Sequence, residues 1–298
     1  MFIMRMVPAV LQPLVVWMLP YKWRLRANLK ELESFIVPQV VHRKEIEHSG
    51  EKGPVPATLL AWMVKDAKYD IERDPYMLTQ LFTSLLAGGT YSSANFIVSV
   101  LLDLLENPQF LEEIRGEIEQ KHGEVGGHWD FEALNSLHKL ESAFKETIRL
   151  TPGSLTTYSR VMLKNHTLSN GIRLKKSQFI CVSSNCRAKD SAIYSFPEEY
   201  DGMRAYNRDL QDHIARPFRG LHSQEFRWGS GRWACAGRYF ASLISKVIIV
   251  KLLDEYDFKL VDDRGRPSRT VLHEFIYVKP GVKILMRRRT TNLGIECY

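Results

Sequence analysis

The stretch Phe226-Arg227-Trp228-Gly229-Ser230-Gly231-Arg232-Trp233-Ala234-Cys235-Ala236-Gly237-Arg238 carries the densest turn signals in the chain. Its glycines at positions 229, 231 and 237 let the backbone turn sharply and come close to a flat partner. Residues 239–253 follow at once, and their strongly apolar character predicts a buried helix. The chain thus carries a glycine-rich loop with one cysteine that runs directly into a predicted helix.

Cys235 stands just before the predicted helix, and its residue type leaves two interpretations open. A lone cysteine ahead of an apolar helix is most often a small buried hydrophobe. The N–H groups and the positive dipole end at the start of a helix, in contrast, favour a thiolate. A thiolate held in a glycine-rich hairpin is the ligand that a haem iron needs.

Apolar spacing predicts helices in the first half of the chain and short strands in the second. The predicted helices cover residues 27–48, kinked or broken at Pro38, then 59–63, 76–105, 108–121 and 140–150, the last capped by Ser136. A break is expected at residues 51–56. The predicted strands cover residues 157–162, 172–175, 179–183, 258–261, 275–278 and 282–286, and residues 187–224 are expected to be irregular. The predicted fold class is mainly α with small antiparallel β-sheets (α+β).

The predicted helix over residues 76–105 is apolar on most sides, so we expect it to run through the middle of the fold. Its centre carries Gly88 and Gly89, which together cost up to about 2 kcal/mol relative to alanine. Two explanations stay open: another helix packs closely against the glycines, or a ligand approaches the backbone there.

Composition excludes several classes of protein. The 298 residues are 45% hydrophobic and 25% charged with a net charge of +7, which excludes a disordered, collagen-like or disulfide-stapled chain. The four cysteines form no Cys-x-x-Cys pair, as expected in a reducing compartment. The N-terminal basic residues interleave only with Tyr21 and Trp23, so no nucleic-acid binding is expected.

The apolar N-terminal segment, residues 7–19, is shorter than the roughly 20 residues of a membrane-spanning helix. It also lacks the small-residue cleavage site of a signal peptide. We expect no transmembrane anchor in this chain. We expect instead a helix that packs on the protein or contacts a membrane surface, where the basic residues on either side would favour anionic lipids.

Taken together, these motifs resemble the cytochrome P450 haem-thiolate monooxygenases. The overall character of the sequence is similar to that of the family members in fungal secondary metabolism. Trp228, Gly231, Cys235 and Gly237 match the spacing of the family's haem loop, which spans residues 226–238. The family's helical Glu-x-x-Arg matches Glu146 to Arg149, and the arginine of its aromatic and acidic meander matches Arg204. The double-glycine helix resembles the family's oxygen-binding helix.

The resemblance implies the C-terminal part of the cytochrome P450 fold, with residues 1–298 forming a single domain that lacks the family's N-terminal portion. Cys235 would be the axial ligand of haem b, and the segments 153–157 and 272–274 would line the substrate pocket. The other implied roles are cofactor contacts at Arg160, Trp228, Gly231, Arg232 and Gly237, proton handling at Thr90 and Ser92, and a buried ionic network of Glu146, Arg149 and Arg204.

The sequence departs from the family pattern at three places. Thr90 and Tyr91 stand where an acid and a threonine are common, and Trp233 stands where a basic partner of a haem propionate is usual. Arg232, next to Trp233, would take over that role.

The resemblance implies a monooxygenase that oxidises an apolar, terpenoid-like secondary metabolite with O₂. Its electrons would come from NADPH-cytochrome P450 reductase, at the endoplasmic reticulum membrane surface or in the cytoplasm. Two alternatives stay open. One is a truncated, catalytically inactive relative with or without haem, and the other is a haem-thiolate isomerase or dehydratase, which would not need the missing acid.

Overall fold

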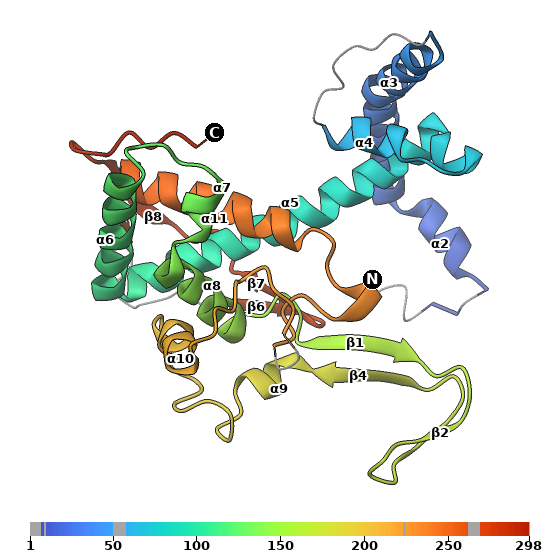
Figure 1. The fold of residues 1–298 in the computed structure, drawn as a ribbon. Helices are drawn as coiled ribbons and strands as arrows, with labels where there is room; N and C mark the ends of the chain where they lie inside the picture. The colour runs from blue at the N-terminus through green and yellow to red at the C-terminus, as the bar shows by residue number, and fades with distance from the viewer. Residues whose placement is uncertain (1–6, 9, 50–57, 223–224, 262–268, 298) are drawn as a thin grey trace. The chain divides into compact units, whose positions relative to one another are not determined.

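Helix α5 (Pro75–Glu106) runs from the first into the second of two units, residues 1–90 and 91–298 (Figure 1). The computed structural model describes residues 7–8, 10–49, 58–222, 225–261 and 269–297. The predicted break at residues 51–56 therefore lies outside the described residues.

The first unit is helical in its described residues. Its elements are α2 (Gln12–Met18), α3 (Pro20–Ser49), α4 (Leu59–Lys65), the 3-10 helix η1 (Asp70–Arg73) and the first half of α5. The sequence predicts a kink or a break at Pro38. The prediction of a break is wrong, because α3 continues across that residue. Ile36 and Val40 on either side of Pro38 are buried in a small core, and their burial offsets the roughly 3 kcal/mol cost of an interior proline. The other core members are Leu60, Val64 and Leu78.

Helix α5 begins where the sequence predicts a helix start. Pro75 is its first residue, and the Asp74 carboxylate accepts the N–H of Met77 at 2.8 Å. The expectation that α5 runs through the middle of the fold holds only for its C-terminal part. Val100 and Leu104 are fully buried there, whereas Leu85, in the N-terminal half, is exposed.

The close packing considered for Gly88 and Gly89 is absent among the described atoms, because a Cβ added to either glycine meets none within 4 Å. By length and composition alone, α5 could cross a membrane. The core helix of a soluble protein meets the same criterion.

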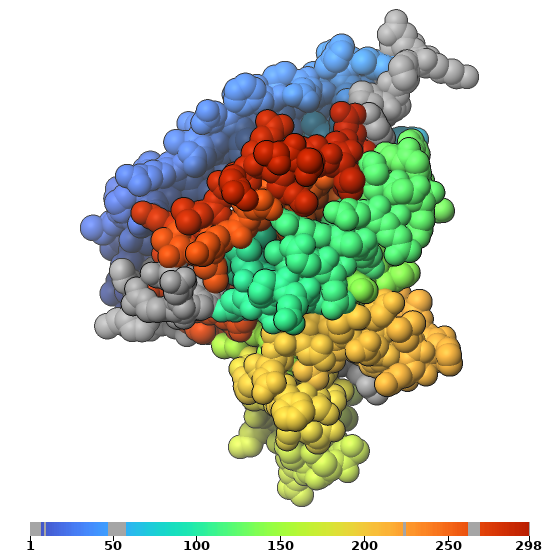
Figure 2. All heavy atoms as spheres, turned by 90° about the vertical axis from the view of Figure 1, so that its left-hand side faces the viewer, coloured from blue at the N-terminus to red at the C-terminus, as the bar shows by residue number. Residues whose placement is uncertain are grey.

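In the second unit, helices gather around the buried end of α5 (Figure 1). The helices of this unit are α6 (Pro108–Glu124), α7 (Phe131–Asn135), α8 (His138–Leu150), α9 (Ser184–Ala188), α10 (Arg204–Asp212), the 3-10 helix η2 (Gly231–Trp233) and α11 (Arg238–Glu255). Helix α11 packs against α6 and α7, and α8 packs against α6 and α10. Trp129 pairs with Cys297 in a parallel bridge, and Figure 2 shows the red C-terminal segment beside the green of α6.

Two predictions about the helices of this unit are wrong. Ser136 does not cap α8, because α8 begins at His138 and the Ser136 hydroxyl instead donates to the Ala133 carbonyl at the end of α7. Residues 187–224 are not irregular throughout, because they contain α10. Long-range contacts hold α10 in place: the Tyr206 N–H donates to Ser142 Oγ at 3.0 Å, and Lys145 pairs with Asp209 at 2.9 Å.

The strands form four antiparallel pairs among the described residues. They are β1 (Thr156–Val161) with β4 (Phe179–Ser183), β2 (His166–Thr167) with β3 (Arg173–Leu174), β5 (Tyr256–Leu260) with β8 (Ile284–Arg288), and β6 (Arg269–Leu272) with β7 (Phe275–Val278). The predicted strand at residues 282–286 is shifted by two residues relative to β8, and β2 and β6 were not predicted. The predicted fold class, mainly α with small antiparallel sheets, is confirmed.

Gly202 makes a close approach that a sequence cannot reveal. A Cβ at this position would overlap the Phe110 ring, which is 8% exposed and belongs to the core of the second unit. We expect Gly202→Ala to lower the free energy of unfolding by about 1–3 kcal/mol through overpacking.

Gly116, in α6, is the matched control, because its Cβ would meet nothing within 4 Å. Gly116→Ala is expected to raise the free energy of unfolding by about 0.5–1 kcal/mol. Chemical denaturation followed by circular dichroism measures both changes. Equal changes in the two variants would contradict the packing described at Gly202.

Candidate functional site

The loop of residues 226–238 closes on itself in front of α11. The Cys235 N–H donates to the Trp228 carbonyl at 2.7 Å, across the short helix η2. Gly229 has φ of +73°, and a Cβ there would come within 3.3 Å of the Trp233 carbonyl oxygen. A residue with a side chain would strain this turn. The loop therefore presents Cys235, which is exposed, at the end of a tight hairpin.

Cys235 also lies next to the first turn of α11. Gly237 is the N-cap residue of this helix, and its carbonyl accepts the N–H of Ala241 at 2.8 Å. A Cβ on Gly237 would lie 3.9 Å from Cys235 Sγ, so the backbone passes close to the sulfur. Arg238 donates to the Cys235 carbonyl at 3.0 Å, a contact that the sequence did not suggest. The positive end of α11 thus lies near the thiol, and the Arg238 guanidinium contacts the backbone carbonyl of Cys235.

Two arginines flank the indole of Trp233, which is 65% exposed. The guanidinium carbon of Arg232 lies 4.7 Å from the ring centroid, and that of Arg160 lies 5.7 Å from it. Arg160 comes from β1, where a bulge gives Tyr158 a φ of +53°. The structure therefore brings two cations to the side of the loop where the family pattern has its usual basic residue.

Tyr158 and Arg187 both contact Phe226, at the start of the loop. The Tyr158 ring meets the Phe226 ring edge-on at 5.3 Å, and the Arg187 guanidinium lies over that ring at 5.3 Å. These contacts anchor the first residue of the loop to β1 and α9.

Glu146, Arg149 and Arg204 form one network, as the resemblance implies. Arg149 donates to both Glu146 carboxylate oxygens, at 2.7 and 2.9 Å, and Arg204 Nε donates to Oε1 at 3.1 Å. Arg149 also donates to the backbone carbonyls of Ala188, Pro197 and Glu199. The network thus ties α8 to the segment that leads into α10.

Tyr200 lies in the same segment and is shielded from water. Burial raises the pKa of Tyr200 above its ordinary value. Its hydroxyl group therefore stays protonated at physiological pH.

An aromatic cluster connects the loop to the core. The Phe218 ring stacks on Phe96 of α5 at 5.4 Å, and it meets Phe144 of α8 and Trp228 of the loop edge-on at 5.4 and 5.2 Å. The Trp228 Nε1–H donates to the Phe218 carbonyl at 2.6 Å. Trp228 is thus fixed by both its ring and its polar atom.

Thr90 and Ser92 are both exposed on α5. Thr90 is the last residue of the first unit, whereas Ser92 and Cys235 belong to the second unit. Between them, Tyr91 meets Tyr277 of β7 edge-on at 5.2 Å.

Asn95, one turn further along α5, is a residue that the sequence did not reveal. Its amide donates to the Ile276 carbonyl at 3.1 Å and accepts the Val278 N–H at 2.9 Å. Asn95 therefore attaches strand β7 to α5.

The two segments expected to line a pocket lie side by side. Leu155 N–H donates to the Glu274 carbonyl at 2.6 Å, and Ser154 pairs with Phe275 in an antiparallel bridge. Leu272 and Phe275 remain 59% and 44% exposed, respectively. They form an apolar surface beside the point where Asn95 attaches β7.

The chemistry of Cys235 fits a haem iron better than a bare metal ion. Within the described part of the chain, no group of three or more His, Cys, Asp or Glu side chains could hold a metal ion. A metal at the exposed Cys235 must therefore bring its other ligands with it, as haem iron does. The tight backbone at Gly237 and the cations at Arg160 and Arg232 suit a flat, anionic group.

Fold and loop together define a mainly helical protein with a single thiol presented in front of a helix. A family model, described as cytochrome P450, matches residues 1–286. The chain belongs to the cytochrome P450 family. This is a haem-thiolate family in which a cysteine ligates the haem iron.

The relatives are fungal monooxygenases. The cytochrome P450 monooxygenase olcJ of Penicillium canescens is 33% identical over 99% of this chain and 56% of its own length. The ent-kaurene oxidase of Fusarium fujikuroi is 29% identical over 97% of this chain and 54% of its own length. The monooxygenase ptmP of Penicillium ochrochloron is 31% identical over 97% of this chain and 65% of its own length. The chain thus spans little more than half the length of several curated relatives.

Proposed function

We propose that this chain carries the haem-thiolate site of a monooxygenase that oxidises an apolar secondary metabolite. The observation that carries the proposal is the loop itself: it closes through the hydrogen bond from Cys235 N–H to the Trp228 carbonyl and leaves Cys235 exposed in front of α11. Cys235 would ligate the iron of haem b as a thiolate. Bound haem would activate O₂ with electrons from a reductase, so that one oxygen atom enters the substrate.

The chain's own residues would hold the cofactor and manage protons. Arg160 and Arg232 would pair with the haem propionates from either side of Trp233. Gly231 and Gly237 would let the backbone approach the ring, and Trp228 would fix the loop against the core. Thr90 and Ser92 would supply hydroxyl groups for proton transfer on α5.

The apolar surface of Leu272 and Phe275 supports an apolar substrate. Two relatives are named ent-kaurene oxidases, which supports a terpenoid-like substrate class. The electrons would come from NADPH-cytochrome P450 reductase, and the protein would work at the endoplasmic reticulum membrane surface or in the cytoplasm.

Both units would belong to one cytochrome P450 domain. A single family model spans them, and α5 runs through both. The loop at residues 226–238 would be the haem-binding loop of that domain.

A second candidate is a haem-thiolate isomerase or dehydratase, which Thr90 and Tyr91 favour. Thr90 stands where the family pattern commonly has an acid, and Tyr91 stands where it commonly has threonine. Tyr91 also packs against Tyr277. A reaction without O₂ activation would tolerate this arrangement.

Haem uptake and labelled oxygen test both candidates. The purified 298-residue chain is titrated with haemin and then given reductase, NADPH and ent-kaurene under ¹⁸O₂. We expect one haem per chain and a product that carries one ¹⁸O atom. A rearranged product without label would support the isomerase, and an absence of haem uptake would overturn both candidates.

A further inference from the structure

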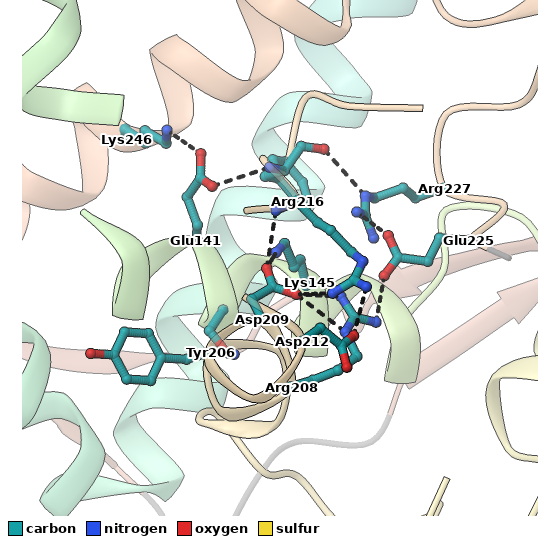
Figure 3. A network of polar contacts seen from close by, with 12 residues as sticks. Glu141, Lys145, Tyr206, Arg208, Asp209, Asp212, Arg216, Glu225, Arg227 and Lys246 are labelled. Carbon is teal, nitrogen blue, oxygen red and sulfur yellow. Dashed lines mark hydrogen bonds and ion pairs between the residues drawn. The ribbon is translucent and has the colours of Figure 1, made fainter. Parts of the chain in front are cut away.

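Glu141 of α8 and Lys246 of α11 form a buried ion pair that no role described above requires. Lys246 is fully buried and Glu141 is 5% exposed. The Lys246 ammonium donates to Glu141 Oε1 at 2.6 Å (Figure 3). It also donates to Asn135 Oδ1 at 2.9 Å. Burial lowers the pKa of Lys246, and the neighbouring carboxylate acts against this effect. Such a pair adds little stability over an apolar pair of the same size, so stability alone does not explain it.

The second carboxylate oxygen of Glu141 binds a backbone group instead of Lys246. Glu141 Oε2 accepts the N–H of Phe218 at 3.2 Å, across 77 residues of sequence. Phe218 is fully buried and lies in the segment between α10 and the Cys235 loop, where no helix or strand supplies a partner for its N–H group. The carboxylate therefore fixes the Phe218 peptide in position.

The carbonyl group of the same residue, Phe218, holds the loop. The Phe218 carbonyl accepts from Trp228 Nε1 at 2.6 Å and from Arg227 Nε at 3.2 Å. The Trp228 carbonyl in turn accepts the Cys235 N–H at 2.7 Å. A continuous hydrogen-bonded path thus runs from Glu141, through the Phe218 and Trp228 residues, to the backbone of Cys235.

A second set of ion pairs reaches the same peptide from α10. Arg227 pairs with Glu225, which pairs with Arg208 at 3.0 Å, and Arg208 pairs with Asp209 at 3.0 Å (Figure 3). Because this set reaches the Phe218 carbonyl through Arg227, the backbone of Phe218 is held at both its N–H group and its carbonyl group.

We propose that Glu141 is a positioning residue for the Cys235 loop, acting through the Phe218 N–H group, while Lys246 balances its charge. Through this path Glu141 sets where the Trp228 carbonyl lies, and hence how the Cys235 backbone N–H is held. The consequence for haem ligation rests on the function proposed above. The positioning itself does not depend on haem.

Two double variants separate positioning from stability. Glu141→Leu with Lys246→Met replaces the ion pair by an apolar pair and leaves the Phe218 N–H without its acceptor. Glu141→Gln with Lys246→Met also removes both charges, but its amide oxygen can still accept from Phe218. Glu117→Leu is the matched control. Glu117 accepts the Lys139 and Leu140 N–H groups at 2.8 and 3.0 Å, at the start of the same helix α8, and has no link to Phe218.

The measurement is hydrogen–deuterium exchange of the Cys235 amide in the haem-free 298-residue chain. Exchange in buried amides of α6 serves as the measure of overall folding. We expect the Glu141→Leu, Lys246→Met variant to speed exchange at Cys235 about tenfold relative to the α6 amides, because the hydrogen-bonded path is broken. The Glu141→Gln, Lys246→Met variant and the Glu117→Leu control are expected to keep the wild-type ratio.

Trp228→Phe tests the next hydrogen bond of the path, from Trp228 Nε1 to the Phe218 carbonyl. It also provides a result if the double variants do not fold. It keeps the ring and removes the Nε1–H donor, so exchange at Cys235 should again rise relative to the α6 amides. An unchanged ratio in Trp228→Phe, or in Glu141→Leu with Lys246→Met, overturns the proposal. A raised exchange ratio at Cys235 in Glu141→Gln with Lys246→Met also overturns the proposal, because this variant keeps an acceptor for the Phe218 N–H group.

A haem-loaded readout follows from the same variants. The fraction of chain that gives a thiolate-type Soret band after reduction and addition of carbon monoxide should fall in Glu141→Leu with Lys246→Met and recover with glutamine at position 141. If wild-type chain takes up no haem, the proposed function fails while the exchange experiment still decides the role of Glu141.

Discussion

Replacing Glu146 by alanine is expected to lower the free energy of unfolding by about 3–5 kcal/mol. The substitution leaves Arg149, whose side chain is 6% exposed, without the carboxylate that compensates its charge. Arg204 loses the same partner. The change is measured by chemical denaturation followed by circular dichroism.

An exposed ion pair in the same part of the chain supplies the control. Glu198 pairs with Lys189 at 2.6 Å, but the side chains are 67% and 31% exposed. Glu198→Ala is therefore expected to cost no more than about 1 kcal/mol. If Glu146→Ala and Glu198→Ala unfold with the same midpoint, the network of Glu146, Arg149 and Arg204 does not hold the second unit together.

Replacing Cys235 by alanine is expected to weaken haem binding by at least about a hundredfold. Removing partners that merely orient a metal ligand already costs 10–100-fold in affinity, and here the ligand itself is lost. Overall folding should stay unchanged, because the side chain is exposed and the Cys235 N–H group keeps its bond to Trp228. A titration with haemin followed by absorbance measures the affinity.

Cys181 and Cys186 are exposed cysteines outside the loop and serve as controls. Alanine at either position should leave haem affinity within about twofold of wild type, because neither lies in front of a helix of the length of α11. A comparable loss of affinity in all three variants would mean that haem binds through scattered thiols.

Much of the fold could be predicted from local sequence. The helix expected at residues 76–105 is α5 (Pro75–Glu106), and the helix expected at 239–253 is α11 (Arg238–Glu255). Both are long and apolar, so their periodicity is strong. Strands β4 and β7 were predicted at their observed bounds, because both are short runs rich in β-branched and aromatic residues.

The errors have a common physical cause in tertiary contacts. Helix α10 is rich in polar residues and buries only Ala205, so its sequence carries little apolar signal. The contacts with Ser142 and Lys145 that hold it come from α8, more than 60 residues earlier. The exposure of the middle of α5, around Leu85, was equally hidden, because apolar periodicity does not say whether a partner covers each face.

The same division applies to the site. Glycine spacing and one cysteine were enough to locate the loop, because the backbone needs those residue types there. Asn95, Glu141 and Lys246 were missed, because each acts on a segment far away in the sequence. A lone asparagine or a lysine in an apolar helix gives no indication of its partner.

The central claim is that Cys235 is a haem-thiolate ligand, and the reduced carbon monoxide spectrum of the haem-loaded 298-residue chain tests it most directly. The account predicts a thiolate-type Soret shift in the wild-type chain and in Cys181→Ala, and its loss in Cys235→Ala. A wild-type chain that binds haem without this shift, or a Cys235→Ala variant that keeps it, would contradict the account.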